Sequence, residues 1–403
     1  MKTNSNNIPR RDFLKTLVAA GVGSTLGGKT AGAGTMDAGA KLDRVPTRPF
    51  GRTGTDVSIL SLGGMFDIPN NLLMLRQCLN WGVTYWDTAN SYEGGRSESG
   101  IGKFFLNQPG TRKDVFLVTK TGERSIDGMQ AHLDRSLDRA KTDYIDLYFL
   151  HSIWHIDEFT PEIRRWADKQ KASGKIRLIG FSTHKNMEDC LLGAARTGGV
   201  DGIMFTYNYR KMHESRMKKA VDACHEAGIG LTAMKTQGGG SVRTKSEKEL
   251  KLAGRFVQRG FTEEQAKLKA VWENPQIASI CSQMPTLRIL MANIAAAIDK
   301  TQLTDADREA FREYALATCS GYCAGCGDIC AGAAEGAQVS DVMRSLMYYH
   351  SYGDERLARE TFSQLPAGVR NKLAQTDFSI AESHCPQRMP IGRLMKEAAE
   401  RFA

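Results

Sequence analysis

The sequence has no long apolar run, no basic segment interleaved with aromatic residues, and no Gly-x-Gly-x-x-Gly motif after its first expected strand. Because it lacks about eighteen consecutive apolar residues, it offers no helix that would span a membrane. The formal charge of +9, from 54 Lys and Arg against 45 Asp and Glu, is moderate, so nucleic acid is not an expected partner. Hydrophobic residues make up 41% and charged residues 25% of the 403, which excludes a disordered chain and predicts a sizeable core.

Residues 1–33 have the layout of an export signal. The pair Arg10-Arg11 precedes a weakly apolar, glycine-rich stretch over 16–28, and Ala31-Gly32-Ala33 offers small side chains for cleavage. The paired arginines resemble a twin-arginine signal. We therefore expect the twin-arginine export machinery to carry this protein, already folded, to the periplasm or another extracytoplasmic space. The alternative is a flexible basic tail that happens to hold two arginines.

A repeating strand–helix pattern fills residues 46–298. Eight short apolar runs each end in polar or glycine residues, and amphipathic stretches of about ten to fifteen residues separate them. Eight such units in about 250 residues predict an α/β fold, a (β/α)8 TIM barrel. The alternative, a doubly wound open sheet, is disfavoured by the count of eight and by the missing glycine motif. The expected strands are Ser58–Leu62, Val83–Trp86, Val115–Thr119, Tyr144–Leu150, Ile176–Phe181, Gly202–Phe205, Ile229–Ala233 and Ile277–Cys281.

Three further segments lie outside this repeat. Residues 34–45 are expected to link the signal to the barrel. After the seventh expected strand, a glycine triplet and a Lys-rich stretch over 238–251 predict a long loop that acts as a lid at the barrel mouth. Over 299–403 the alternation stops and five of the nine cysteines appear, which predicts a small, mainly helical second module.

Ionisable residues stand at the ends of three consecutive expected strands, namely Asp87, Lys120 and His151, and Tyr92 follows shortly after the first. Barrel enzymes place their catalytic groups at these strand ends. A buried Asp and Lys must pair, and the ammonium would lower the pKa of a neighbouring phenol. Tyr92 is then a candidate proton donor to a carbonyl oxygen that gains negative charge, and His151 would orient the same oxygen. Taken singly, each residue also has a purely structural interpretation.

These residues and several flanking motifs resemble those of the aldo-keto reductase family. The resemblance covers about 46–297 and implies reversible hydride transfer between NAD(P)H and a small carbonyl compound, or the corresponding alcohol. It implies that Tyr92 is the general acid and Lys120 its pKa modifier. Asp87 would be the partner of Lys120, and His151 the group that orients the carbonyl. The motifs are Phe50–Gly54, Asp87–Tyr92, Ser97-Glu98 with Gly102, Val118–Lys120, Leu150-His151, Gly174–Arg177 and Ile179–Ser182.

The nicotinamide pocket implied by this resemblance departs from the family's usual residues. Ser182 is present after the fifth strand, but Thr183 replaces the usual Asn. Met204 stands where a Gln is usual on the sixth strand. After the seventh strand, Met234 and Lys235 replace an aromatic residue that often stacks on the nicotinamide ring, and a Met can still cover a ring face.

The segment 284–293 resembles the part of the family that binds the phosphate and the adenine of the cofactor. Arg288 would meet a 2′-phosphate, although it is offset by one position from the usual basic residue. The resemblance therefore predicts NADP or NAD as cofactor and leaves the choice open. The expected cofactor-binding residues are Ser182, Thr183, Met234, Lys235, Met284, Thr286, Arg288 and Asn293.

Five cysteines cluster near the C-terminus, whereas the other four are scattered through the barrel and are expected to be buried apolar residues. Thiolates at such close spacing can bind one metal centre. The Cys-x2-Cys-x3-Cys part and the distant Cys-Pro resemble a bacterial two-cluster ferredoxin that has lost its second run of cysteines, which implies one [4Fe–4S] cluster at most. The candidate metal ligands are Cys319, Cys323, Cys326, Cys330 and Cys385.

Two ligand sets are open for such a cluster. In the two-cluster pattern Cys319, Cys323 and Cys326 act together with Cys385, and Cys330 is spare. In a local set Cys330 takes the place of Cys385. The other interpretations are disulfides formed in an oxidising compartment, a decayed vestige, and a zinc site with four cysteines.

Two functions are compatible with these features. The first is an oxidoreductase that is exported folded with its nicotinamide cofactor already bound, because free NAD(P)H is not expected outside the cytoplasm. It would couple the oxidation of one substrate to the reduction of another, or exchange electrons with an external carrier through the cluster. The second is a non-catalytic or electron-transfer protein on an aldo-keto reductase barrel, with a vestigial or disulfide-bonded tail.

Overall fold

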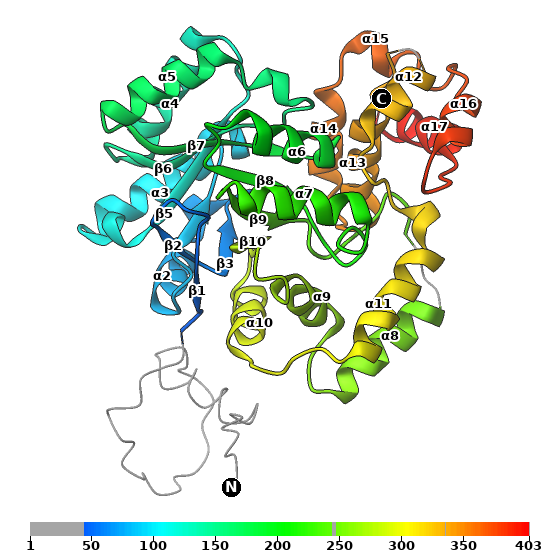
Figure 1. The fold of residues 1–403 in the computed structure, drawn as a ribbon, viewed down its shortest axis with the longest axis horizontal. Helices are drawn as coiled ribbons and strands as arrows, with labels where there is room; N and C mark the ends of the chain where they lie inside the picture. Colours follow the sequence, from blue (N-terminus) through cyan, green and yellow to red (C-terminus); the bar gives the residue numbers. More distant parts are fainter. Residues whose placement is uncertain (1–43, 244–246, 335, 403) are drawn as a thin grey trace, which may run out of the picture. The chain divides into compact units, whose positions relative to one another are not determined.

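The computed structural model describes residues 44–243, 247–334 and 336–402 (Figure 1). From residue 44 onward the chain packs as one unit. The predicted signal over 1–33 and nearly all of the predicted linker over 34–45 lie outside the described residues. In the described part of the chain, no helix combines the length and the apolar character needed to cross a bilayer.

Within the described ranges, eight parallel strands close into a barrel, and each is followed by a helix before the next strand begins. This confirms the predicted (β/α)8 fold. The runs are apolar because barrel strands are buried by side chains inside and by helices outside. The strands are β3 (Leu60–Gly63), β4 (Tyr85–Asp87), β5 (Phe116–Thr121), β6 (Ile145–Leu150), β7 (Ile176–Thr183), β8 (Gly202–Thr206), β9 (Gly230–Met234) and β10 (Ser279–Gln283).

The outer layer of the barrel is built from amphipathic helices whose apolar side faces the strands. Several begin at a side-chain cap, as at Thr160, whose hydroxyl accepts a hydrogen bond from the Ile163 amide. The helices are α2 (Leu72–Asn80), α3 (Arg96–Asn107), α4 (Ile126–Ala140), α5 (Pro161–Ala172), α6 (Met187–Thr197), α7 (Ser215–Glu226), α9 (Glu263–Trp272) and α10 (Leu287–Ile298).

The first predicted strand, Ser58–Leu62, is divided in the structure. Its first residue ends β2 (Asp56–Ser58), which pairs antiparallel with β1 (Thr47–Pro49), and the barrel strand β3 begins only at Leu60. The hairpin carries Phe50, which is fully buried and packs against the rings of Tyr85 and Phe116. Since these two residues begin β4 and β5, the hairpin closes the N-terminal end of the barrel, and the opposite end is left for chemistry.

The predicted lid over 238–251 is a loop only in part. Residues 244–246 lie outside the described chain, and helix α8 (Glu247–Gln258) starts directly after them. Helix α8 packs against α11 (Asp305–Ala317), and Phe256, Phe311 and Tyr314 share one apolar core. The expectation of a loop as far as residue 251 was therefore wrong, because a helical apolar face is buried there.

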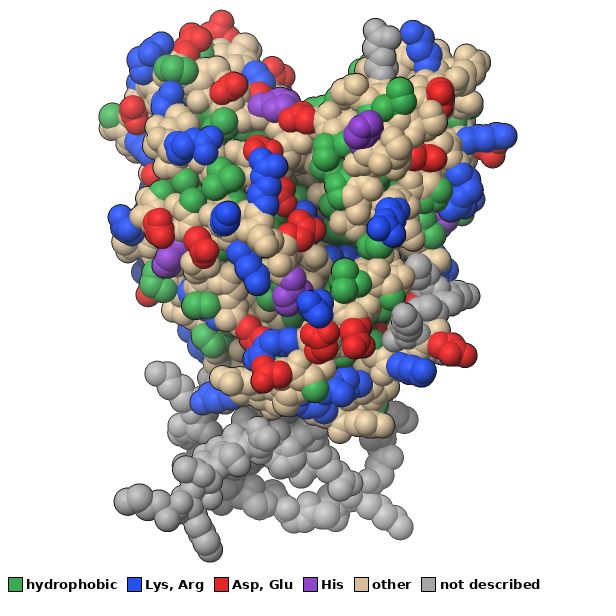
Figure 2. Space-filling view, turned by 45° about the vertical axis from the view of Figure 1, so that its right-hand side comes forward, with side chains coloured by type: hydrophobic (Ala, Val, Ile, Leu, Met, Phe, Trp, Pro, Cys, Tyr) green, Lys and Arg blue, Asp and Glu red, His purple; other side chains and the backbone are tan. Residues whose placement is uncertain are grey.

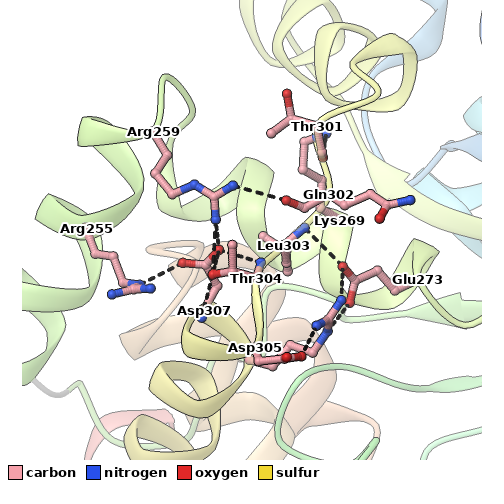
Figure 3. A network of polar contacts seen from close by, with 11 residues as sticks. Arg255, Arg259, Lys269, Glu273, Thr301, Gln302, Leu303, Thr304, Asp305 and Asp307 are labelled. Carbon is pink, nitrogen blue, oxygen red and sulfur yellow. Dashed lines mark hydrogen bonds and ion pairs between the residues drawn. The ribbon is translucent and has the colours of Figure 1, made fainter. Parts of the chain in front are cut away.

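A polar network ties α8, α9 and α11 together (Figure 3). Asp307 is fully buried and accepts hydrogen bonds from Arg255 Nε at 2.7 Å, from the Arg259 guanidinium, and from the Thr304 hydroxyl at 2.8 Å. The carboxylate of Asp299 contacts Lys269 Nζ at 3.0 Å in the same region. The start of the C-terminal segment is thus fixed to the side of the barrel.

Asp307→Asn is expected to lower the free energy of unfolding by about 2 kcal/mol, because the neutral amide loses charge-assisted hydrogen bonds to two arginines. Urea denaturation followed by circular dichroism measures this loss. Asp305→Asn is the matched control, since Asp305 is fully exposed in its ion pair with Arg308 and its loss should not change stability. Equal behaviour of the two variants would contradict the role given to Asp307.

The remaining residues, here called the helical tail (299–402), form a second core and cover part of the C-terminal end of the barrel. Helix α13 meets the loops that follow the strands: Ser241 Oγ donates to the Met343 carbonyl at 2.8 Å, and Lys185 pairs with Asp341. Figure 2 shows the surface hollowed between the barrel helices and this tail. The tail helices after α11 are α12 (Gly327–Ala333), α13 (Val339–His350), α14 (Glu355–Ser363), α15 (Ala367–Arg370), α16 (Ser379–His384) and α17 (Ile391–Phe402).

Candidate active site

The barrel register brings Asp87 and Lys120 together. Asp87 lies opposite Val118, and because side chains alternate along a strand, Lys120 points to the same side two residues later. The Lys120 ammonium lies 2.6 and 2.7 Å from the two carboxylate oxygens of Asp87, and it donates to the Thr88 carbonyl at 2.8 Å. Lys120 and Asp87 are both buried, so each charge is neutralised by the other.

Tyr92 and His151 stand directly beside this pair. Tyr92 begins the short 3-10 turn η2 (Tyr92–Gly95), and its hydroxyl lies 3.2 Å from Lys120 Nζ. His151 follows β6, and its ring lies 5.7 Å from the Tyr92 ring at an angle of 76°. Both residues are largely but not completely buried, so a ligand can reach them from the barrel mouth. The structure thus brings all four predicted residues together at the C-terminal end of the barrel.

The pKa of Tyr92 differs from the sequence-based expectation. Burial raises this pKa well above its ordinary value, and the Asp87 carboxylate adds to the rise. The expected lowering by Lys120 is absent because the ammonium is already neutralised by Asp87 at 2.6 Å. Tyr92 therefore carries its proton at neutral pH, which suits a proton donor.

The residues predicted to bind the cofactor do not gather at one point. Ser182 Oγ accepts from the Ser152 amide at 2.9 Å, and Thr183 Oγ donates to the Ile153 carbonyl at 2.9 Å. Both hydroxyls are thus engaged with the backbone. Met234 ends β9, Lys235 follows it, and both are partly exposed, whereas Met284 is fully buried.

The end of β10 and the start of α10 offer donors that face away from the barrel interior. Thr286 caps α10 by accepting from the Ile289 amide, and Arg288 in the first turn is exposed. Asn293 donates to Ser282 Oγ at 3.0 Å. A helix N-terminus with a free guanidinium is a suitable place for a phosphate group.

The barrel also matches a known sequence family. The sequence model of the Aldo/keto reductase family matches residues 61–297, which is more than half of the chain. The chain belongs to the aldo/keto reductase family. It is accordingly an oxidoreductase of the aldo-keto reductase type, and Lys120 and its three predicted partners lie within the matched range.

Relatives of this aldo/keto reductase come from several organisms. An uncharacterized oxidoreductase YrpG of Bacillus subtilis is 29% identical over 226 residues, covering 49% of this chain and 68% of its own length. An aldo-keto reductase yakc [NADP(+)] of Schizosaccharomyces pombe is 31% identical over 213 residues, with 49% and 60% covered. Among solved structures, an aldo-keto reductase from Bacillus halodurans in its holo form has a TM-score of 0.56 at 22% identity, covering 67% of this chain and 96% of that one. The structural likeness supports the barrel fold.

Several basic residues at the mouth of this aldo/keto reductase were missed by the sequence analysis. His184 and Lys185 follow β7 directly, immediately after the predicted cofactor residues Ser182 and Thr183. Arg344 comes from α13 in the helical tail. Its place at the barrel mouth could not be predicted, because no local sequence pattern shows that α13 packs there. With Lys235 they line one cavity, described below.

Four of the five candidate metal ligands line a second cavity of about 310 Å³ of empty space, its opening to solvent included. They are Cys323, Cys326, Cys330 and Cys385, whereas Cys319 lies in the turn η5 (Cys319–Gly321) outside this lining. Burial raises the pKa of Cys323 and Cys330 to about 12. Each of the described cysteines is a free thiol, and within the described ranges no three His, Cys, Asp or Glu side chains converge closely enough to hold a metal ion.

This arrangement does not match either ligand set predicted from the sequence, because both of them include Cys319. The fold brings Cys385 near the first run of cysteines, as the ferredoxin-like set requires, but it places Cys330 rather than Cys319 beside it. A [4Fe–4S] cluster is larger than a single metal ion, so its cysteine ligands stand further apart than those of one ion. Four thiols around one cavity therefore fit the donor chemistry of such a cluster.

The stability of this aldo/keto reductase is expected to fall as the pH drops below about 6.5, the ordinary pKa of histidine. Burial lowers the pKa of both His151 and His184 well below that value, and the cations Lys120 and Lys235 add to the effect. The unfolded chain then binds protons that the folded chain does not, so the free energy of unfolding rises with pH in this window.

Denaturant titrations at pH 5.5, 6.5 and 8 measure this dependence. His184→Gln should reduce the slope, because one buried neutral imidazole is removed. His225→Gln is the control, since His225 is exposed on α7 and its replacement should leave the slope unchanged. A slope that His184→Gln does not alter would contradict the assignment.

Proposed function

We propose that this protein interconverts a carbonyl compound and an alcohol by hydride transfer with NADP(H) or NAD(H). One observation carries the proposal: the Lys120 ammonium contacts the Asp87 carboxylate and the Tyr92 hydroxyl together, with the His151 ring packed beside Tyr92. A proton donor and an imidazole that face one small space can hold a single carbonyl oxygen between them.

When bound, a reduced nicotinamide would supply the hydride that adds to the carbonyl carbon. Tyr92 donates its hydroxyl proton to the oxygen as negative charge develops there, so one hydride and one proton give the alcohol. Lys120 Nζ donates a hydrogen bond to the Tyr92 oxygen at 3.2 Å and so holds the phenol in place, and Asp87 keeps Lys120 in position. His151 is neutral because its pKa is lowered by burial and by Lys120, so it orients the oxygen by hydrogen bonding without competing as an acid.

For the cofactor, the exposed Arg288 and the first turn of α10 are the proposed contacts of a 2′-phosphate, which favours NADP. The relative from Schizosaccharomyces pombe carries NADP(+) in its name, which agrees with this choice. Titration of the purified protein with NADPH and NADH, followed by fluorescence quenching, tests the proposal. Saturable NADPH binding that Arg288→Gln weakens is expected. No saturable signal, and no dinucleotide released on denaturation, would overturn it.

We also propose that the helical tail binds one [4Fe–4S] cluster through Cys323, Cys326, Cys330 and Cys385. The support is their common cavity, which has mainly apolar side chains such as Met343, Met389 and Ile391 as its other walls. When bound, the cluster would carry single electrons between the protein and an external carrier. Cys323 and Met343 also line the basic cavity at the barrel mouth, so the two sites are neighbours.

Anaerobic purification, ultraviolet–visible spectroscopy and iron analysis test the cluster. The arrangement of the thiols predicts that Cys330→Ser loses the iron–sulfur absorbance and that Cys319→Ser, the matched control, keeps it. A protein without iron would reject the cluster. Loss of absorbance in Cys319→Ser with retention in Cys330→Ser would favour the ferredoxin-like ligand set instead.

We further propose that residues 1–33 act as a twin-arginine signal and that the folded protein reaches the periplasm with its cofactor bound. The support is the sequence pattern of Arg10-Arg11 and the small residues near 31–33. Mass spectrometry of the protein recovered from the periplasm tests this. The expected result is a chain that lacks the signal and releases a nicotinamide dinucleotide on denaturation. Recovery without the dinucleotide would contradict loading before export.

A second candidate function is electron transfer or ligand binding without hydride chemistry. The engagement of the Thr183 hydroxyl with the Ile153 and Lys185 carbonyls favours it, since that hydroxyl is not available to a nicotinamide amide. The Tyr92→Phe variant in the Discussion separates the two functions.

A further inference from the structure

A basic cavity lies where α13 of the helical tail meets the mouth of the barrel. Its empty space is about 500 Å³, the part open to solvent included. His184 and Lys185 from the loop after β7, Lys235 from the end of β9, and Arg344 from α13 line it. Neither the barrel nor the tail forms this cavity alone.

The positive charges in this cavity exceed the negative ones. Lys185 is paired with Asp341 and lies 3.3 Å from the centre of the Trp154 ring. Arg344 reaches the same carboxylate with one nitrogen at 3.2 Å. One carboxylate therefore pairs with both Lys185 and Arg344. The Lys235 ammonium, 5.6 Å from the centre of the Tyr348 ring, makes no hydrogen bond or ion pair with the described residues.

Two buried polar atoms at this place also lack partners. Arg344 Nε and His184 Nδ1 have no hydrogen-bond partner in the described structure. A buried N–H without an acceptor is costly, and an anion that accepts a hydrogen bond from Arg344 Nε would remove the cost. Arg344 could then bind a planar or tetrahedral anion through the nitrogens that Asp341 does not use.

The cavity adjoins the catalytic residues. His151 follows β6 where Leu150 pairs with Phe181 of β7, and the next residue, Ser152, donates its amide to Ser182 Oγ at 2.9 Å. His184, which lines the cavity, comes two residues after Ser182, just past the end of the same strand. A molecule with its carbonyl at Tyr92 would therefore extend its other end toward Arg344 and Lys235.

We infer that Arg344 and Lys235 bind an anionic group of the substrate, so that the protein acts on carbonyl compounds bearing a carboxylate or a phosphate. This inference rests on the hydride-transfer function proposed above. The helical tail then has a role in specificity, because it supplies the guanidinium that completes the site. The diphosphate of a dinucleotide is the other source of such an anion, and the experiment is designed to tell the two apart.

The test compares D-glyceraldehyde 3-phosphate with D-glyceraldehyde, which differ by one phosphate, using the full-length protein and NADPH. The wild type should show a KM at least about ten-fold lower for the phosphorylated aldehyde, and Arg344→Gln should raise that KM about ten-fold or more. The KM for D-glyceraldehyde and the Kd for NADPH should not change. Lys235→Gln should weaken the binding of inorganic phosphate measured without cofactor, and this measurement keeps the test valid if Arg344→Gln does not fold.

Arg359→Gln is the matched control, because Arg359 is half-exposed on α14, forms an ion pair with Glu355 and does not line the cavity. Calorimetric titration with inorganic phosphate tests the site without any turnover. Phosphate should bind the wild type and the control, and Arg344→Gln should bind it about ten-fold more weakly. Phosphate binding without turnover of any aldehyde would reject the hydride-transfer proposal but support the anion site.

Two results would overturn the inference. One is equal KM values for the two aldehydes together with no phosphate binding. The other is an Arg344→Gln variant that weakens NADPH binding and leaves the preference between the aldehydes unchanged, since Arg344 would then serve the diphosphate of the cofactor.

Discussion

Tyr92→Phe is expected to lower kcat/KM for carbonyl reduction by about 10²- to 10⁴-fold, the usual contribution of a general acid. The substitution removes the hydroxyl that lies 3.2 Å from Lys120 Nζ but keeps the ring that packs on His151. The folded state and NADPH binding should therefore persist. NADPH oxidation in a screen of aldehydes and ketones measures the loss, and fluorescence titration measures cofactor binding.

Tyr144→Phe is the matched control for this variant. Tyr144 precedes β6 at the opposite end of the barrel, where its ring packs on the guanidinium of Arg112 at 3.8 Å and makes no use of its hydroxyl in that contact. Its activity should equal that of the wild type. A Tyr92→Phe variant that is as active as Tyr144→Phe would refute the role of Tyr92 and leave the non-catalytic interpretation standing.

Lys120→Met is expected to abolish activity and to lower the free energy of unfolding by about 3–5 kcal/mol, because it leaves the buried Asp87 carboxylate without its cationic partner. Burial already raises the pKa of Asp87, and only Lys120 and the Cys281 thiol oppose this. Without Lys120 the carboxyl would be protonated in the folded state over a wider pH range. The stability loss should therefore be smaller at low pH and should grow as the pH rises above the pKa of the unfolded Asp.

Guanidinium titrations at two pH values measure this effect. The double variant Asp87→Asn/Lys120→Met should recover part of the lost stability, since no buried charge is left, but it should recover no activity. Lys175→Met removes an exposed ion pair with Asp134 and should cost less than about 1 kcal/mol. If Lys120→Met lowers the free energy of unfolding no more than this surface control does, the buried pair does not stabilise the fold as proposed.

Much of the fold could be read from local patterns. Each of the eight barrel strands overlaps an apolar run, because a strand buried on both faces needs apolar residues at nearly every position. The prediction for Ser58–Leu62 was wrong only at its start, because Ser58 belongs to the hairpin strand β2 and pairs with Thr47 of β1. Nothing in the run itself distinguishes pairing in the hairpin from pairing in the barrel.

The helix at the predicted lid shows a different limit. The residues over 247–258 have a helical apolar face. The glycine triplet and the lysines that precede this face nevertheless led to the prediction of a loop as far as residue 251. The partner of that face is α11, about fifty residues later. A sequence pattern shows that a face must be covered and does not show what covers it.

The sequence by itself determined the barrel and the four residues around Lys120, since strand ends in a closed parallel barrel must meet at one mouth whatever the loops do. Only the tertiary structure decided which cysteines share a cavity and that Arg344 lines a cavity with His184 and Lys235. It also decided that Asp87 neutralises Lys120, so that burial raises the pKa of Tyr92 instead of Lys120 lowering it. The reason is that these features depend on distances between segments far apart in the chain, and packing fixes those distances, whereas local periodicity does not.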